Sequence, residues 1–546
     1  SVTVPHDWAI YGPFSSLNDK QEVAISQDGQ KEAMEHAGRT GGLPFVGVGW
    51  YRTEFDVPQF QAGKRATILF DGAMSHANVY INGQKVGYWP YGYNSFHFDI
   101  TKYLKPGEKN TLAVRLENLP ESSRWYPGAG LYRNVHLIIT EDAYIPVWGT
   151  YITTPSVNEK FAKVNVRTKV VLPEGADPAK YSVETSVWNP NKQKLTAVRT
   201  SLAQMKYNNN QAEQEFVIQT PSLWSPEMPA LYSAETRLYE GDKLKDIYTT
   251  PFGIRSIEII PDKGFFLNGK RTVFKGVCNH HDLGPLGAAV NDAAIRRQIR
   301  ILKDMGCNAI RTSHNMPAPE LIRACDEMGM MIMAESFDEW NVAKCKNGYN
   351  LLFDEWAEKD LVNLLHNFRN NPSVVMWCIG NEVPNQWNEG DCKIAKWLQD
   401  ICHREDPTRP VTQGMDAPDA VVNNNFAAVM DVAGFNYRPF KYKINYKKLP
   451  QRIVLGSETA STVSSRGVYK FPVERKAMAK YDDHQASSYD VEHCGWSNLP
   501  EDDFIQHEDL PYCIGEFVWT GFDYLGEPTP YYTDWPSHSS LFGIID

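Results

Sequence analysis

The chain has 546 residues, of which 42% are hydrophobic, and a formal net charge of −11. This charge argues against a nucleic-acid partner, whose phosphates need a basic patch, and no apolar run approaches the roughly 20 residues of a membrane span. The length predicts about three or four domains. The 15 Trp and 27 Tyr exceed what cores need and favour a ligand with flat apolar faces, such as a sugar.

The first half of the chain predicts β-structure. Between residues 50 and 140, short alternating apolar runs are separated by turn dipeptides such as Asn82-Gly83. This pattern predicts a β-sandwich of the jelly-roll type over residues 1–142. Further alternating runs over residues 143–254 fit an immunoglobulin-like β-sandwich.

From residue 255 onward, predicted strands alternate with helices. Asn291 can cap a helix that ends at Gly306. Counting apolar runs gives eight strands, at residues 273–280, 309–314, 331–335, 374–382, 411–414, 432–437, 453–458 and 517–523. Eight strand–helix units predict a catalytic (β/α)8 TIM barrel over residues 255–546, in which the carboxyl ends of the strands carry the chemistry.

Two of these strands end in glutamate. An apolar run ends in Asn381-Glu382, and a later one ends in Glu458. A lone Glu382 could simply cap a loop, but the second strand makes a pair. Two carboxylates at one mouth are what glycoside hydrolysis needs, because one protonates the leaving oxygen while the other attacks or activates water. The remaining polar or aromatic residues at strand ends are His280, His314, Tyr437 and Trp519.

Other candidates have weaker support. We expect the remaining carboxylates near strand ends to be hydrogen-bonding or support groups; they are Glu335, Asp338, Glu339 and Glu516. The His280-His281-Asp282 run lacks an H-E-x-x-H helix and a clear third ligand, so no metal site is predicted. The nine cysteines have irregular spacing and no C-x-x-C pair, which indicates buried free thiols.

Several motifs, taken in order, resemble glycoside hydrolase family 2, which includes bacterial β-galactosidases, β-glucuronidases and β-mannosidases. They are Val4-Pro-His-Asp-Trp8, Gly49-Trp-Tyr-Arg52, the run from Arg124 to Arg133, Arg311-Thr-Ser-His-Asn315, Gly380-Asn-Glu382, Ser457-Glu458 and the run from Phe517 to Asp523. The resemblance implies a jelly roll, an immunoglobulin-like domain and a barrel. It also implies a retaining mechanism with Glu382 as acid/base and Glu458 as nucleophile.

The resemblance implies a sugar site around this pair. Asn381 is expected to contact the sugar 2-hydroxyl, and Tyr437 is expected to lie beside the nucleophile. The other residues that we expect to bind substrate are His280, His314, Trp519, Glu339 and Arg124.

Within the family the chain is most similar to β-galactosidases, in the run from Trp519 to Pro530 and in Trp535-Pro-Ser-His538. The Asn-x-Lys motif by which glucuronidases hold the uronate is absent between Gly521 and Asp546. We therefore expect cleavage of terminal β-D-galactosides. A β-glucuronidase, another β-glycosidase of the family and a non-catalytic carbohydrate-binding protein are the alternatives.

Two departures from the best-known β-galactosidase pattern bear on cofactors. Asn341 replaces a metal-binding His, and Ser461 replaces a sugar-contacting His. We predict no cofactor, and a partner that is a β-galactoside oligosaccharide or a substrate derived from a polysaccharide. A homo-oligomer and a periplasmic or cytoplasmic location in a bacterium are left open. Because the family normally continues past the last residue, we expect a fragment.

Overall fold

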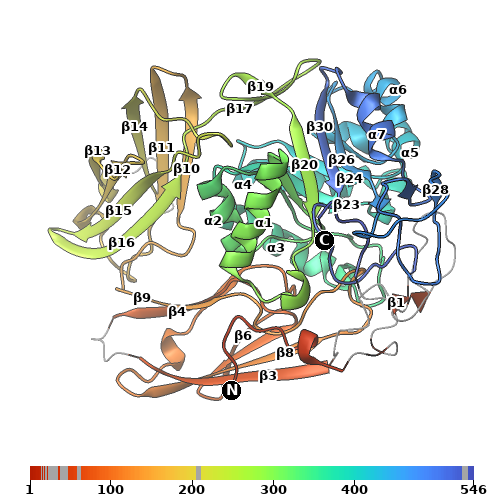
Figure 1. Ribbon diagram of the computed structural model, residues 1–546. Coiled ribbons are helices and arrows are strands. Elements are labelled where there is room, and N and C mark those ends of the chain that lie inside the picture. Colours follow the sequence, from red (N-terminus) through yellow and green to blue (C-terminus); the bar gives the residue numbers. More distant parts are fainter. Residues whose placement is uncertain are drawn as a thin grey trace.

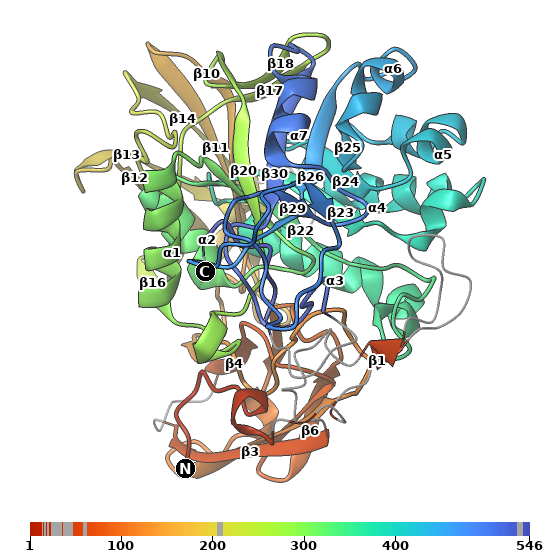
Figure 2. The ribbon, with the colours of Figure 1, turned by 45° about the vertical axis from the view of Figure 1, so that its right-hand side comes forward.

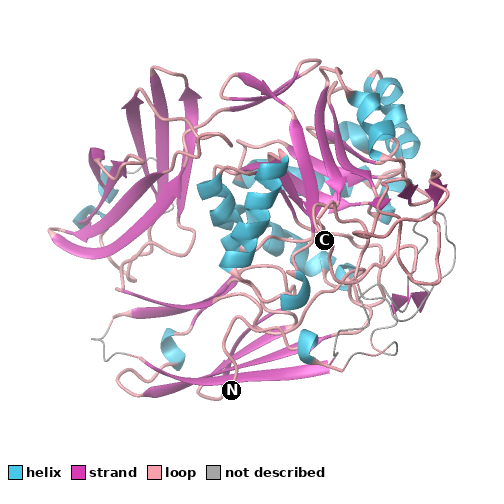
Figure 3. Cartoon of the chain, viewed as in Figure 1, coloured by secondary structure: helices cyan, strands magenta, loops and turns pink. Residues whose placement is uncertain are grey.

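The computed structural model describes residues 1–13, 15, 18, 21–22, 35–36, 47–57, 63–204, 211–531 and 539–545. Two β-sandwiches and a (β/α)8 barrel make up the fold, as expected (Figure 1, Figure 3). The N-terminal sandwich lies below the barrel and the second sandwich lies beside it. The motif at residues 535–538 lies outside the described residues.

The N-terminal sandwich has a four-stranded and a three-stranded sheet. The first has the order β3 (Gly47–Asp56), β8 (Lys109–Asn118), β5 (Ala77–Ile81), β6 (Gln84–Trp89), and the second has the order β7 (Phe96–Asp99), β4 (Arg65–Phe70), β9 (Val135–Thr140). Strict alternation in β4 and β5 turns every second side chain into the core, where Phe70 stacks on Phe96. A separate pair consists of β1 (Gln21–Glu22) and β2 (Glu35–His36).

The second sandwich is also built from antiparallel strands. One sheet has the order β10 (Thr150–Val157), β11 (Phe161–Lys169), β14 (Gln211–Gln219), and the other has the order β13 (Lys194–Ser201), β12 (Tyr181–Trp188), β15 (Tyr232–Glu240), β16 (Lys243–Phe252). A buried carboxylate joins this sandwich to the barrel: Asp406 accepts hydrogen bonds from Tyr151 at 2.8 Å and from Trp377 at 3.0 Å.

Eight parallel strands close into the barrel. They are β20 (Phe274–Asn279), β21 (Ala309–Thr312), β22 (Met331–Glu335), β23 (Val374–Asn381), β24 (Val411–Met415), β25 (Ala433–Asn436), β26 (Val454–Ala460) and β30 (Cys513–Trp519). The eighth strand begins earlier than the sequence predicted, because Cys513 already pairs with β26 and Gly515 with β20; it ends at Trp519. Glu516 therefore lies within this strand, where it accepts a hydrogen bond from Thr459 at 2.6 Å.

The main helices around the barrel are α1 (Asp292–Met305), α2 (Pro319–Met328), α3 (Phe353–Phe368), α4 (Cys392–Glu405), α5 (Pro418–Asn423), α6 (Tyr442–Tyr446) and α7 (Pro500–His507). Asn291 caps α1 by accepting a hydrogen bond from Ala294 N–H at 3.0 Å, and Gly306 ends it with a φ of 99°. The remaining short strands are β17 (Ile257–Ile260), β18 (Gly264–Leu267), β19 (Lys270–Thr272), β27 (Thr462–Val463), β28 (Lys476–Ala477) and β29 (Glu492–His493).

The N-terminal sandwich lies against the barrel (Figure 2), and buried polar contacts tie the two together. Arg133 is 1% exposed and donates to the carbonyl oxygens of Tyr93 at 2.7 Å and Met316 at 2.8 Å. Asp360 on α3 accepts hydrogen bonds from Trp89 at 2.9 Å and from Asn94 at 2.7 Å. Arg133 thus holds the loop between β8 and β9 against the barrel, and Asp360 holds the end of β6 and the connection to β7.

All nine cysteines are free; Cys307 and Cys392 are half-buried and the other seven are buried. Within the part of the chain that the structure describes, no helix is long and apolar enough to cross a membrane.

Candidate active site

Glu382 and Glu458 meet at the carboxyl ends of β23 and β26. The amide nitrogen of Asn436, the last residue of β25, lies 3.0 Å from Glu382 Oε1 and 3.3 Å from Glu458 Oε2. Glu382 has a left-handed φ of 42°, and its N–H donates to the Gly414 carbonyl at 2.8 Å. One amide group can bridge only oxygens that lie close together, so the carboxyl groups of Glu382 and Glu458 lie next to each other.

The Glu458 carboxylate is held at both of its oxygens. Arg311 Nη1 donates to Oε2 at 2.9 Å, and the Tyr437 hydroxyl donates to Oε1 at 2.6 Å. Tyr437 is itself in hydrogen-bond contact with Ser461. Hydrogen bonds to a carboxylate from a charged donor and a phenol are among the stronger ones in proteins, so the orientation of Glu458 is fixed.

Arg311, on β21, is the centre of this arrangement. Its side chain is fully buried, and its Nε donates to Glu335 Oε2 at 2.6 Å. Its Nη2 donates to Asn381 Oδ1 at 2.8 Å, and its Nη1 also donates to the Ser457 carbonyl at 2.9 Å. Because the guanidinium is planar and its donors form a rigid fork, it places these acceptors in one fixed geometry.

The two carboxyl groups influence each other electrostatically. Burial and, second, the charge of Glu382 raise the pKa of Glu458 to about 8, although Arg311 and the hydrogen bond from Tyr437 oppose the rise. Two carboxylates in one buried site do not both ionise readily, and their protons belong to the pair. The negative charge of Glu382 thus favours the protonated form of Glu458.

An aromatic wall lines the same mouth. The His314 ring stacks on Trp519 with 5.1 Å between centroids and 7° between planes, and the His280 ring lies 4.2 Å from that of Tyr524. Both ring nitrogens of His280 are buried without a hydrogen-bond partner in the described structure. Trp125 reaches the wall from the N-terminal sandwich, 5.0 Å from His280. The two ring nitrogens of His280 are therefore available to bind a polar ligand.

Arg124 also enters from the N-terminal sandwich and pairs with Asp338. Its Nε and Nη2 lie 3.0 and 2.7 Å from the two oxygens of Asp338. Lys344 Nζ contacts Asp338 at 2.9 Å, and Asn381 Nδ2 donates to it at 3.1 Å. Burial alone would raise the pKa of Asp338, but Arg124 and Lys344 hold it well below its usual range. This cluster fixes the amide of Asn381 from the side opposite to Arg311.

Glu339 lies apart from the carboxylate pair. Its carboxylate accepts backbone N–H groups of Lys344, of Cys345 at 3.2 Å and of Asn350 at 3.1 Å, so it shapes the loop after β22. Asn341 Oδ1 accepts a hydrogen bond from Asn385 at 2.9 Å. Among the described residues, no group of three or more His, Cys, Asp or Glu side chains is arranged to hold a metal ion.

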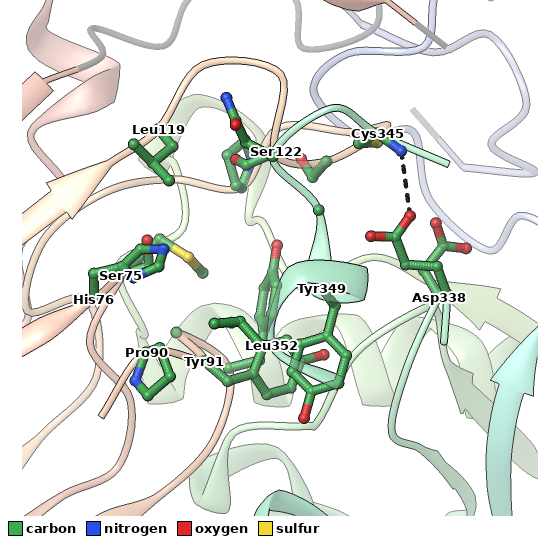
Figure 4. A pocket seen from close by; sticks show the side chains of 18 of the residues that line it. Ser75, His76, Pro90, Tyr91, Leu119, Ser122, Asp338, Cys345, Tyr349 and Leu352 are labelled. Atoms are coloured by element: carbon green, nitrogen blue, oxygen red, sulfur yellow. Dashed lines mark hydrogen bonds between the residues drawn. The ribbon is translucent and has the colours of Figure 1, made fainter. Parts of the chain in front are cut away.

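A cavity of about 80 Å³ lies in the seam between the N-terminal sandwich and the barrel. Asp338 and His314 belong to its lining, together with Tyr91, Tyr349 and Trp125. In Figure 4, Asp338 and Cys345 lie on one side of the cavity and His76 and Pro90 on the other. The lining of this cavity therefore comes from both the N-terminal sandwich and the barrel.

Family models match three consecutive stretches of the chain. "Glycosyl hydrolases family 2, sugar binding domain" matches residues 43–141, "Glycosyl hydrolases family 2" matches residues 144–255, and "Glycosyl hydrolases family 2, TIM barrel domain" matches residues 258–532.

Among curated proteins, the chain is 39% identical to the beta-galactosidase BoGH2A of Bacteroides ovatus, over 100% of this chain and 66% of that protein. It is 29% identical to a beta-glucuronidase of Bacteroides fragilis, over 88% of this chain and 70% of that protein. The chain thus spans slightly less than two thirds of the length of the B. ovatus protein.

Solved structures give the same relationship. A glycosyl hydrolase family 2 member from Bacteroides cellulosilyticus is 32% identical with a TM-score of 0.84, over 99% of this chain and 64% of that chain. A beta-glycosidase from Bacteroides vulgatus is 31% identical with a TM-score of 0.84, over 100% of this chain and 69% of that chain.

The electrostatic coupling of the pair can be tested directly. Glu382→Gln removes a neighbouring negative charge, so the pKa of Glu458 is expected to fall from about 8 toward the ordinary value of a glutamate. The measurement is a pH titration of the ¹³C carboxyl signal of Glu458, with Glu389→Gln at an exposed position as the matched control. An unchanged pKa in Glu382→Gln would contradict the close approach of the two groups.

Proposed function

Since the chain belongs to glycoside hydrolase family 2, we propose that it is a retaining β-galactosidase that cleaves terminal β-D-galactosides through a covalent glycosyl-enzyme. The observation that carries this proposal is the contact of one amide, that of Asn436, with both Glu382 and Glu458. Retaining glycosidases hold their two carboxyl groups about 5–5.5 Å apart, whereas inverting enzymes need about 6.5–9.5 Å to admit a water molecule. Two carboxyl groups bridged by one amide favour the shorter separation.

In the proposed first step, Glu458 attacks the anomeric carbon while Glu382 gives its proton to the departing oxygen. A bond forms between carbon and carboxylate, and the bond to the aglycone breaks. In the second step Glu382 takes a proton from water, the water oxygen bonds to the anomeric carbon, and Glu458 leaves as a carboxylate. The configuration at the anomeric carbon is inverted twice and so retained.

The fixed contacts of Glu458 suit a nucleophile. Arg311 and Tyr437 donate to separate oxygens, which keeps the carboxylate aimed and stabilises its charge when the glycosyl-enzyme breaks down. A proton on the pair suits the first step, because one group must be neutral to act as acid while the other is charged. Formation of the glycosyl-enzyme removes one charge and allows Glu382 to act as base.

The charges near the pair favour a neutral sugar. A uronate carboxylate would need a cation that is free to bind it, because an unpaired charge is costly to bury. Arg124 and Lys344 pair with Asp338, and Arg311 pairs with Glu335 and Glu458. The 39% identity to a β-galactosidase also supports galactose as the sugar.

A β-glucuronidase is the second candidate, because one of the relatives bears that name at 29% identity. A non-catalytic carbohydrate-binding protein has less support, since both glutamates are present and both accept a hydrogen bond from Asn436.

Aryl β-D-galactoside, β-D-glucuronide and β-D-mannoside, assayed side by side, test the proposed substrate. We expect kcat/KM for the galactoside to exceed that for the glucuronide by about 100-fold or more, since Arg124, Lys344 and Arg311 are already paired and a desolvated, unpaired uronate costs several kcal/mol. Preference for the glucuronide or the mannoside would overturn the choice of galactose and leave the family mechanism intact.

The acid/base role of Glu382 predicts a dependence on the leaving group. In Glu382→Ala, kcat/KM is expected to fall by about 10²–10⁴-fold for alkyl galactosides, whose departing oxygen needs a proton, and far less for dinitrophenyl galactoside. Azide should restore turnover and give β-galactosyl azide. Glu389→Ala is the control. Equal losses on both substrates without azide rescue would remove Glu382 from this role.

A further inference from the structure

Glu335 is a fully buried carboxylate at the end of β22. Its Oε2 accepts a hydrogen bond from Arg311 Nε at 2.6 Å, and its Oε1 lies 2.8 Å from Nδ1 of His314. The carboxylate therefore contacts two residues of the same strand–loop segment, one of which also holds Glu458. None of the steps proposed above uses Glu335, so those steps do not explain why this carboxylate is buried beside Arg311 and His314.

Two groups compete for Nδ1 of His314. Glu335 Oε1 requires a hydrogen on Nδ1, whereas Arg311 Nη2, at 3.4 Å, would require a lone pair there. The contact with Glu335 is shorter by 0.6 Å. Burial raises the pKa of Glu335, but the short ion pair with Arg311 opposes the rise and favours a charged acceptor. Arg311 Nη2 already donates to Asn381 at 2.8 Å. A short charge-assisted bond outweighs a long one, so the hydrogen lies on Nδ1.

The state of the ring follows from its surroundings. Burial and, second, the charge of Arg311 lower the pKa of His314 well below the usual value, so the imidazole is neutral and carries one hydrogen. With that hydrogen on Nδ1, the other nitrogen, Nε2, presents a lone pair. Nε2 lies 3.9 Å from Glu458 Oε2, and stacking on Trp519 holds the plane of the ring.

We propose that Glu335 is a positioning residue that holds His314 in the Nδ1–H tautomer, so that Nε2 accepts a hydrogen bond from a sugar hydroxyl beside the nucleophile. The part of this inference that concerns the sugar rests on the proposed function. The opposite tautomer would point an N–H toward the Glu458 carboxylate, which would stabilise its charge and compete with attack. By fixing this tautomer, Glu335 favours a ligand whose hydroxyl group donates a hydrogen bond to Nε2 of His314.

Glu335→Gln tests the tautomer with almost no change in shape. Arg311 Nε is a donor, so it keeps the amide oxygen of the new side chain on its own side and turns the NH₂ group toward His314. An NH₂ group facing Nδ1 favours a lone pair there and moves the hydrogen to Nε2. If Glu335 had a purely structural role, the hydrogen of His314 would not move from Nδ1 to Nε2 in this variant.

The direct readout is the ¹⁵N NMR spectrum of histidine-labelled free protein, with the His314 signals identified by their loss in His314→Gln. We expect the Nδ1–H pattern in the unaltered protein and the Nε2–H pattern in Glu335→Gln. Glu320→Gln, at a buried carboxylate on α2 outside the site, is the matched control and should leave the His314 pattern unchanged. An Nε2–H pattern in the unaltered protein, or no change in Glu335→Gln, overturns the inference.

The second readout uses inhibition constants of methyl thio-β-galactosides that carry a deoxy or a deoxyfluoro substitution at each hydroxyl in turn. At one position both analogues should bind about tenfold more weakly than the parent, because fluorine cannot donate to Nε2. In Glu335→Gln the fluoro analogue should regain affinity relative to the deoxy analogue. Equal tolerance of fluorine at every position in the unaltered protein overturns hydroxyl recognition. An Nδ1–H signal without binding of any galactoside would refute the proposed substrate and leave the tautomer standing.

Discussion

A buried guanidinium is the constraint on which the site depends. Arg311 has no exposed surface, and an isolated charge in such a place would cost several kcal/mol. The barrel compensates it with Glu335 and Glu458, and with the amide oxygen of Asn381. Since these acceptors come from β22, β26 and β23, one side chain fixes the relative position of three strand ends. Arg311 thus positions Glu458 directly, and it positions Asn381, the residue next to Glu382.

The N-terminal sandwich completes the site rather than merely lying next to it. Arg124 and Trp125 come from the loop between β8 and β9, and they contact Asp338 and His280 of the barrel. Buried hydrogen bonds from Arg133 to the carbonyl oxygens of Tyr93 and Met316 keep that loop in place. The barrel alone would leave the charge of Asp338 balanced only by Lys344 and would lack one side of the aromatic wall.

The sequence predicted the class of fold and the two glutamates, because apolar strands that end in a carboxylate are local patterns. It did not predict the role of Asn436, which lies one residue before the expected Tyr437 and carries no distinguishing local signal. Nor could spacing reveal the pairing of Arg124 with Asp338, since barrel closure and docking of the sandwich bring them together. The eighth strand was placed too late, because its pairing with β20, and not its apolar run, sets its end.

In the proposed mechanism, Glu458 forms a covalent bond to a galactosyl group. Mass spectrometry of peptides can detect this bond after treatment with an activated 2-deoxy-2-fluoro-β-galactoside, which slows breakdown of a glycosyl-enzyme more than its formation. We expect one fluorogalactosyl group per chain, attached to the peptide that contains Glu458 and lost on reactivation with a sugar acceptor. A label on Glu339 or Glu516, or an enzyme that turns over galactosides with inversion and no label, would contradict it.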